Sequence, residues 1–356
     1  MFFKKHVSPL FSKLFASENE FGKAYVNEFE NAIPEGSYLE GEDLISGVGI
    51  DRLFSEIFSA VSGNSSLVIS FFLLLLGLGL LISLADLSGE LLSPKLHSAV
   101  RAGVSVIASL LIFERMETLV FSVGENLESL SGFFSALIPI ITGISLSSGA
   151  VATAGIQAAN MNLTLALLGK LSSDFLMPLV FMIFALALTS SLGEGGAAKL
   201  AKGSKSVFMW GLGIISSILI ASVSMQSFLA SSKDGAALRA AKYAISGSIP
   251  IVGSTVSGAL STLTGALAEA RAFVGVGSIA VIFVMAASPI IIMLAYRLAL
   301  SVSMWLFDFV GSSGANSVFS AFRSALDALI SLYSLSAVVY ILEIAIFLRG
   351  GVSVFV

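Results

Sequence analysis

Residues 70–85 read SFFLLLLGLGLLISLA, and the longer stretch 64–85 carries no charged side chain. A helix rises about 1.5 Å per residue, so about 20 apolar residues cross the ~30 Å hydrocarbon core of a bilayer. The stretch therefore predicts a membrane-spanning helix. Further complete or partial spans are predicted at 99–121, 129–169, 175–192, 207–230, 243–268, 272–296, 298–322 and 328–348.

The composition agrees with a chain that lies mostly in a membrane. Hydrophobic residues make up 56% of the 356 residues, charged residues make up 12%, and the mean hydropathy is +0.96. A soluble domain carries roughly 25% charged residues, so this chain has too few to cover a water-exposed surface. A soluble enzyme, a disordered chain and a basic nucleic-acid binder are excluded. We expect an all-α, polytopic membrane helix bundle with seven or eight crossings.

The charges divide the chain into parts. Residues 1–56 hold 5 Lys/Arg and 10 Asp/Glu, whereas the other 300 residues hold 14 and 13. We therefore expect an acidic polar N-terminal segment at 1–63, a transmembrane helical domain at 64–349 and a tail at 350–356. The lysine-rich loop 193–205 is cytoplasmic by the positive-inside rule, and counting spans backwards from it places the acidic segment outside the cytoplasm.

Two uncharged stretches are rich in small residues and contain a proline. Residues 139–155 read PIITGISLSSGAVATAG, and residues 246–268 read SGSIPIVGSTVSGALSTLTGALA. Proline interrupts helical hydrogen bonding, and glycine permits tight turns and close helix approach. We expect two broken hairpins, either re-entrant or fully spanning, although simple close packing of helices fits the same composition. The hairpin-forming residues are predicted to be Pro139, Gly143 and Gly149 in the first, and Pro250, Gly253 and Gly258 in the second.

An internal repeat is a further prediction. At an offset of 111, segment 135–231 aligns with segment 246–342 without gaps, so that Pro178 meets Pro289. Both segments then contain a broken hairpin, a proline-bearing span and another span in the same order, a pattern found in many transporters. Chance similarity in a chain built from few residue types is the alternative.

Ionisable residues within apolar stretches are the candidate functional groups. A charge at the centre of a membrane helix costs about 2.5–3.5 kcal/mol, so such residues usually have a role. The conduit or gating candidates are Arg297, Asp308 and Glu343. The alternative is that Arg297 and Glu343 reach the membrane surface from helix ends. Arg323 and Asp327 are spaced i, i+4, so they can pair on one helix face.

Catalytic motifs are absent from the sequence. It contains no HExxH, no GxGxxG after a strand and no phosphate-binding GxxxxGK[ST] loop, and it has no cysteine. We therefore expect no enzymatic activity, no catalytic residues, no metal site and no cofactor. Any energy would come from a partner or an ion gradient.

The sequence resembles a known family in the two proline- and glycine-rich stretches. Residues 242–260, KYAISGSIPIVGSTVSGAL, and residues 137–151, LIPIITGISLSSGAV, resemble the stage III sporulation protein AE family of endospore-forming bacteria. The likeness in layout extends over about residues 60–348. Members of that family usually begin with a signal sequence, and residues 1–16 contain no apolar core of that kind.

The resemblance implies a non-enzymatic, permease-like or conduit-forming subunit of a secretion-like channel complex that links mother cell and forespore. The implied location is the mother-cell membrane surrounding the forespore. The implied partners are the lipid bilayer, other stage III sporulation membrane proteins and a cytoplasmic ATPase subunit, with self-association left open and no nucleic acid. The alternative function is a stand-alone secondary transporter for a small solute or ion, and a structural membrane scaffold is a third reading.

Overall fold

The computed structural model describes most of the membrane body. The described residues are 50–88, 92–170, 206–222, 253–310 and 313–352, with the single positions 178, 181, 182, 185, 203, 204 and 224. These residues contain helices and no β-strand, which confirms the all-α prediction for this part of the chain. The helices are α5 (Ile50–Leu87), α6 (Pro94–Ser147), α7 (Val151–Lys170), α10 (Gly253–Val310), α11 (Ser313–Val352) and the shorter apolar helix Ser206–Ser222.

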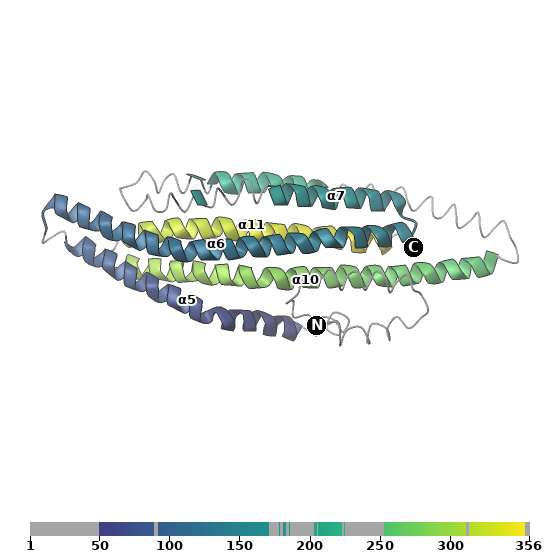
Figure 1. Cartoon of the computed structure of the whole chain (residues 1–356), viewed down its shortest axis with the longest axis horizontal. Helices are drawn as coiled ribbons and strands as arrows, with labels where there is room; N and C mark the ends of the chain where they lie inside the picture. The colour runs from purple at the N-terminus through teal and green to yellow at the C-terminus, as the bar shows by residue number, and fades with distance from the viewer. Residues whose placement is uncertain are drawn as a thin grey trace.

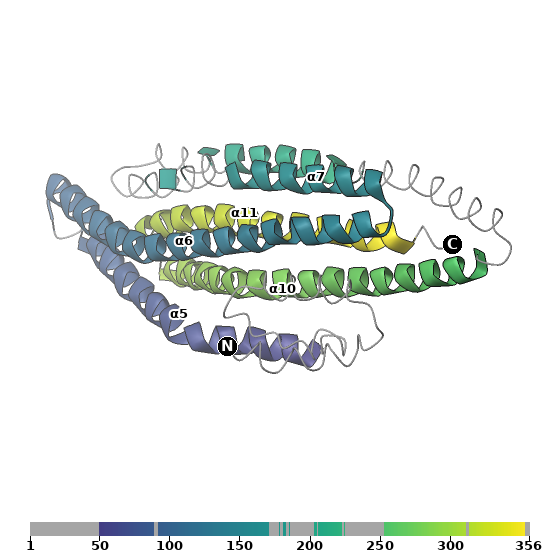
Figure 2. The same ribbon diagram turned by 45° about the vertical axis from the view of Figure 1, so that its right-hand side comes forward.

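The long helices run side by side along one axis. In Figures 1 and 2, α5 and α10 lie on one side, α6 and α11 lie next to α10, and α7 forms an outer row with the helix Ser206–Ser222. Helices α5 and α6 meet at one end of the bundle, and α6 and α7 meet at the other. Helix α7 is therefore attached to the three-helix body of α6, α10 and α11 from the outside.

Five of the described helices contain a stretch long and apolar enough to cross a membrane. These stretches are Ser66–Leu87, Pro94–Ser147, Val151–Lys170, Leu267–Val310 and Val318–Arg349. The first confirms the span expected at 64–85, and the last two contain those expected at 272–296 and 328–348. The total of seven or eight crossings is not confirmed, because most of 175–192 and 223–252 lies outside the described residues.

Helices α6 and α10 are longer than the sequence pattern predicts. The expected span 99–121 and the first arm of the first hairpin are one continuous helix of 54 residues, and α10 has 58 residues. At ~1.5 Å per residue these helices measure about 81 Å and 87 Å, more than twice a bilayer's hydrocarbon core. The prediction of separate elements was wrong because Pro139 lies inside α6 without ending it, and because α10 continues through Arg271 and Arg297, where the predicted spans were divided. Proline is tolerated in apolar helices where neighbouring groups satisfy the freed backbone carbonyls.

The first predicted hairpin is present, with its turn at Ser148–Ala150. Gly149 has φ 78°, a left-handed conformation that favours glycine, and its N–H donates to the carbonyl of Leu146 at 2.9 Å. The adjoining N–H of Ala150 donates to the carbonyl of Ser145 at 3.1 Å, which closes the end of α6. Gly149 therefore forms the turn. Pro139 and Gly143, predicted to share that role, lie within α6.

The second predicted hairpin, at 243–268, is described by the structure only from residue 253 onward. Gly253 begins α10 and Gly258 lies in its first turns, and the helix continues without interruption to Val310, so it is not broken at Gly258 or from there to residue 268. Pro250 lies outside the described residues. Glycine costs about 1 kcal/mol in a helix interior, too little to end a long apolar helix by itself. At the offset of 111, Gly149 corresponds to Leu260 inside α10, so this turn is not repeated and the internal repeat is not confirmed.

The core of the bundle is aromatic and aliphatic. Phe134 stacks on Tyr340 with ring centroids 4.1 Å apart, which joins α6 to α11, and Phe71 stacks on Tyr296 at 4.6 Å, which joins α5 to α10. Helices α5 and α10 come so close at Gly79 that a Cβ there would overlap the ring of Phe307. Such close approach is typical of helix packing in membranes.

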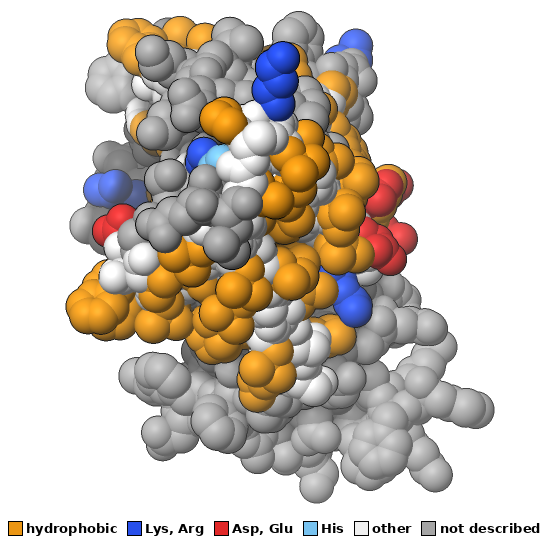
Figure 3. Space-filling model, turned by 90° about the vertical axis from the view of Figure 1, so that its left-hand side faces the viewer, with side chains coloured by type: hydrophobic (Ala, Val, Ile, Leu, Met, Phe, Trp, Pro, Cys, Tyr) orange, Lys and Arg blue, Asp and Glu red, His pale blue; other side chains and the backbone are white. Residues whose placement is uncertain are grey.

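Large apolar side chains also cover much of the outside of the bundle. In Figure 3, which views the end where α5 meets α6, hydrophobic side chains gather over much of the described surface. Leu84 is 62% exposed on α5, and Trp305 and Phe309 are 69% and 90% exposed on α10. An exposed apolar surface of this kind suits lipid rather than water.

Candidate functional site

The candidate site is built around Glu343 on α11. Its side chain is fully buried (0% exposed) within the membrane-span candidate Val318–Arg349. The alternative expectation, that Glu343 reaches the membrane surface from the helix end, is therefore wrong. A buried ionisable group needs polar partners, because transfer of a charge out of water is costly.

Those partners come from the outer row of helices. Asn160 on α7 donates through Nδ2 to Glu343 Oε1 at 2.9 Å, and Thr164 donates through Oγ1 to the same oxygen at 2.8 Å. Ser222 of the helix Ser206–Ser222 donates through Oγ to Asn160 Oδ1. We call these four residues the Glu343 cluster. It joins α7, α11 and the helix Ser206–Ser222 through hydrogen bonds inside an apolar bundle.

Helix α7 carries these polar groups on one of its faces. Gln157, Asn160 and Thr164 are spaced i, i+3 and i+7, which places them on one helix face. All three are buried, at 2%, 8% and 1% exposure, whereas Asn162 and Lys170 on the same helix are exposed. The sequence reading missed them because they carry no charge. Their helical spacing in the uncharged stretch 129–169 was the signal that could have found them.

Two polar atoms in this region have no hydrogen-bond partner among the described residues. Glu343 Oε2 and Gln157 Nε2 are both buried and unsatisfied. Buried polar atoms in folded proteins are nearly always paired, so such exceptions often mark a site for a proton, an ion or water. The Glu343 carboxyl is therefore unevenly satisfied, with two donors on one oxygen and none of the described donors on the other.

A buried cation lies one helical turn further along. The guanidinium of Arg271 on α10 lies over the ring of Phe347, 4.9 Å from its centroid, and its Nη2 is 3.4 Å from Ser145 Oγ. Phe347 follows Glu343 by one turn on α11. Sequence reasoning placed Arg271 near a loop, yet it is only 7% exposed. The cation–π contact and the serine hydroxyl partly replace the water that Arg271 loses.

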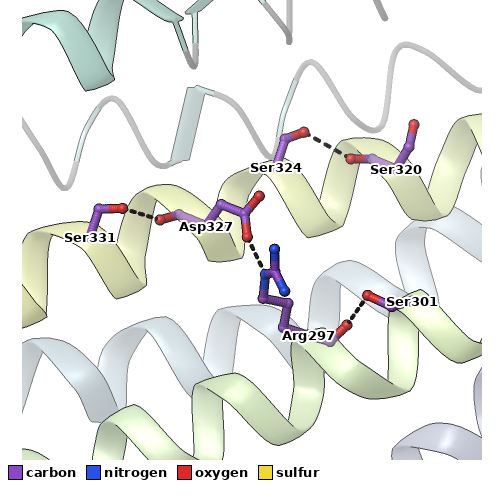
Figure 4. Close-up of polar contacts among 6 residues, drawn as sticks. All are labelled: Arg297, Ser301, Ser320, Ser324, Asp327 and Ser331. Atoms are coloured by element: carbon purple, nitrogen blue, oxygen red, sulfur yellow. Dashed lines mark hydrogen bonds and ion pairs between the residues drawn. The ribbon is translucent and has the colours of Figure 1, made fainter.

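Arg297, a predicted conduit residue, belongs to a different arrangement. Figure 4 shows its Nε bound to Asp327 Oδ1 at 2.5 Å, which joins α10 to α11 by an ion pair. Ser301 and Ser331 donate to the backbone carbonyls of Arg297 and Asp327, each at 2.7 Å. The two charged side chains are 33% and 21% exposed. The i, i+4 spacing would allow Asp327 to pair with Arg323 on its own helix, whereas the ion pair observed here connects two helices.

Asp308, the third predicted conduit residue, lies at the end of α10. It is exposed and accepts a hydrogen bond from Asn316 Nδ2 at 3.1 Å, across the turn into α11. The structure therefore does not bring the three predicted residues together. Only Glu343 lies in a buried polar cluster. Among the described residues, no group of three His, Cys, Asp or Glu side chains could hold a metal ion.

Comparison with known proteins identifies the family. The family model described as stage III sporulation protein AE matches residues 39–351. The chain belongs to the stage III sporulation protein AE family. It is also 25% identical over 300 residues to "Stage III sporulation protein AE" of Bacillus subtilis (strain 168), a match that covers 80% of this chain and 73% of that protein. No solved structure matches it.

Family membership and the apolar helices together describe a sporulation membrane protein. The match contains every residue of the Glu343 cluster, the Arg297–Asp327 pair and the Gly149 turn. The resemblance read from the two proline- and glycine-rich stretches is thus confirmed. It also indicates participation in a stage III sporulation membrane complex.

Proposed function

We propose that this chain is a non-enzymatic, permease-like subunit that lines a conduit in a channel complex between mother cell and forespore. It would lie in the mother-cell membrane surrounding the forespore and work with other stage III sporulation membrane proteins and a cytoplasmic ATPase subunit. The observation that carries this proposal is the Glu343 cluster, a buried polar site inside a membrane-span candidate. Ionisable groups at such positions commonly mark the path of a polar solute or ion.

The outer surface of α6 supports assembly with partners. Glu114, Arg115, Glu125 and Glu128 are exposed near the middle of this 54-residue helix. Apolar side chains such as Ile107, 60% exposed, precede them along the same helix. Charged side chains are costly against lipid, so this part of α6 would face water or another subunit. A polar surface between apolar stretches suits a chain that works inside a complex.

Cysteine labelling in sporulating cells tests the conduit, since the chain has no cysteine of its own. Gln157→Cys places a thiol on the polar face of α7, and Leu73→Cys, at a position 60% exposed on α5, provides a lipid-facing control. A conduit predicts that a membrane-impermeant thiol reagent labels the first variant and spares the second. Deletion of a partner subunit should change the labelling of the first. If Gln157→Cys stays unlabelled in the assembled complex, the conduit proposal is wrong.

The second candidate function is a stand-alone secondary transporter for a small solute or ion. The observation in its favour is again the Glu343 cluster, because transporters bind their substrates through converging polar groups between membrane helices. Purified protein in liposomes distinguishes the two functions. Saturable solute movement by the chain alone favours the transporter, whereas movement that requires partner subunits favours the conduit.

A further inference from the structure

The two oxygens of Glu343 have different surroundings. Oε1 accepts two hydrogen bonds, from Asn160 and Thr164, whereas Oε2 is buried and receives none from the described residues. An ionised carboxylate has two equivalent oxygens that both seek donors. A neutral carboxylic acid has one carbonyl oxygen, which accepts, and one hydroxyl, which carries a proton. The arrangement around Glu343 matches the neutral acid, with Oε1 as carbonyl and Oε2 as hydroxyl.

The charged groups around the cluster leave Glu343 without a bonded counter-ion. On α10, Arg271 is the buried cation, and it contacts the Phe347 ring and the Ser145 hydroxyl. Glu269 on α10, Lys170 on α7 and Arg349 on α11 are exposed. On α6, segment 129–147 has no ionisable residue, and neither does the helix Ser206–Ser222. The remaining nearby titratable group is Tyr340, one turn before Glu343, whose hydroxyl lies 3.0 Å from Ser131 Oγ.

We infer that Glu343 is a proton-binding site of the membrane domain, with the proton held on Oε2. Binding forms one O–H bond and neutralises the carboxylate, and release breaks that bond and returns the proton to water. In the neutral form, Asn160 and Thr164 keep α7 against α11, and Ser222 extends the contact to the helix Ser206–Ser222. Release of the proton leaves a buried negative charge with one unsatisfied oxygen, which disfavours this closed arrangement.

Proton binding would thus control how the outer row of helices attaches to the body of the bundle. Helix α7 is joined to α6 by the tight turn at Gly149, and the hydrogen bonds of Asn160 and Thr164 to Glu343 connect it to α11. The ligand is a proton rather than a metal ion because the cluster offers a single carboxyl group with neutral amide and hydroxyl partners. The inference depends on the cluster geometry alone and holds whether or not the chain lines a conduit.

Infrared spectroscopy of the purified full-length chain in lipid nanodiscs tests this site. A neutral carboxylic acid has a C=O stretching band that an ionised carboxylate lacks. We expect such a band in the wild type, shifted by ¹³C-labelled glutamate and lost when the buffer is made alkaline. It should be missing from Glu343→Gln, displaced in Glu343→Asp and retained in Asp327→Asn. Replacing potassium by sodium at constant pH should leave it unchanged.

Two results would overturn the inference that Glu343 binds a proton. Absence of a Glu343-dependent acid band at every pH would show that the carboxyl stays ionised. Loss of the band on addition of sodium at constant pH would show that the site binds sodium instead. Isotope labelling requires no mutation, so a glutamate band is detected even if a variant fails to fold. Because the spectrum needs no partner subunit, its failure is distinguishable from failure of the cysteine-labelling test of the conduit.

Discussion

Helix α11 carries two carboxylates in opposite situations. Asp327 pairs with Arg297 at 2.5 Å and is partly open to the surroundings, whereas Glu343 is fully buried with neutral partners on one oxygen. They lie 16 residues apart, about 24 Å along the helix at ~1.5 Å per residue. An ion pair between α10 and α11 holds two core helices together. A carboxyl held by amide and hydroxyl groups can change its protonation state without losing a charged partner.

This difference predicts the largest functional effect at Glu343. Glutamine has the shape of the neutral acid and keeps an oxygen for Asn160 and Thr164, so Glu343→Gln should leave the protein level and fold intact. It cannot release a proton, so heat-resistant spores should fall by about tenfold or more. Spore counts with immunoblots of the membrane fraction measure both quantities. A wild-type spore count with normal protein level would remove the functional distinction between the two carboxylates.

The donors to Glu343 should matter for stability as well as function. Asn160→Leu removes the hydrogen bond that Asn160 donates to the buried Glu343 carboxyl and the one that it accepts from Ser222. We therefore expect a loss of about 1–3 kcal/mol in the free energy of unfolding. Thermal unfolding in detergent measures the change. The matched control is Asn162→Leu on the exposed side of α7, where Asn162 donates to its own helix at Ala158 and a change within about 0.5 kcal/mol is expected. Equal losses of stability for Asn160→Leu and Asn162→Leu would show that the hydrogen bonds of the Glu343 cluster do not stabilise the fold.

The sequence predicted the membrane-helix class and the family, but only part of the candidate site. Hydropathy found the α5 span because a long uncharged stretch needs no tertiary information. Glu343 was found because a charge inside an apolar stretch stands out. The sequence did not identify its hydrogen-bonding partners Asn160, Thr164 and Ser222. Uncharged polar residues are common in membrane helices, and only the fold shows which of them converge.

The errors have a common physical origin. Arg297 and Asp327 lie 30 residues apart on different helices, so no local spacing could reveal their ion pair. Two prolines and four glycines were predicted to form broken hairpins, with close packing of helices as the alternative. Of the described hairpin candidates, however, only Gly149 has a left-handed backbone, while Pro139, Gly143 and Gly258 lie inside helices and Gly253 begins α10. Packing along a long bundle outweighs a local preference of about 1 kcal/mol.

A substitution at the Gly149 turn should disturb the Glu343 cluster and leave the Arg297–Asp327 pair unchanged. Gly149→Ala forces a side chain into a left-handed conformation, which should cost about 1–2 kcal/mol. Because α7 carries the donors to Glu343 and makes no part of the Arg297–Asp327 pair, the effect should fall on the cluster. Hydrogen exchange should rise in α7 while the middle of α11 stays protected. A uniform rise along α11 would show that the two regions are coupled.

The smallest effect is expected at the ion pair. Asp327→Asn keeps a hydrogen-bond acceptor for Arg297 but removes the charge, and the pair is partly exposed, so a loss of about 0.5–1 kcal/mol is expected in the free energy of unfolding. Spore counts should follow protein stability alone. The double variant Arg297→Met with Asp327→Leu should recover most of the loss, because an apolar pair replaces the ion pair at the same helix contact. A sporulation defect that persists in a double variant of normal stability would give Asp327 a functional role of its own and end the contrast with Glu343.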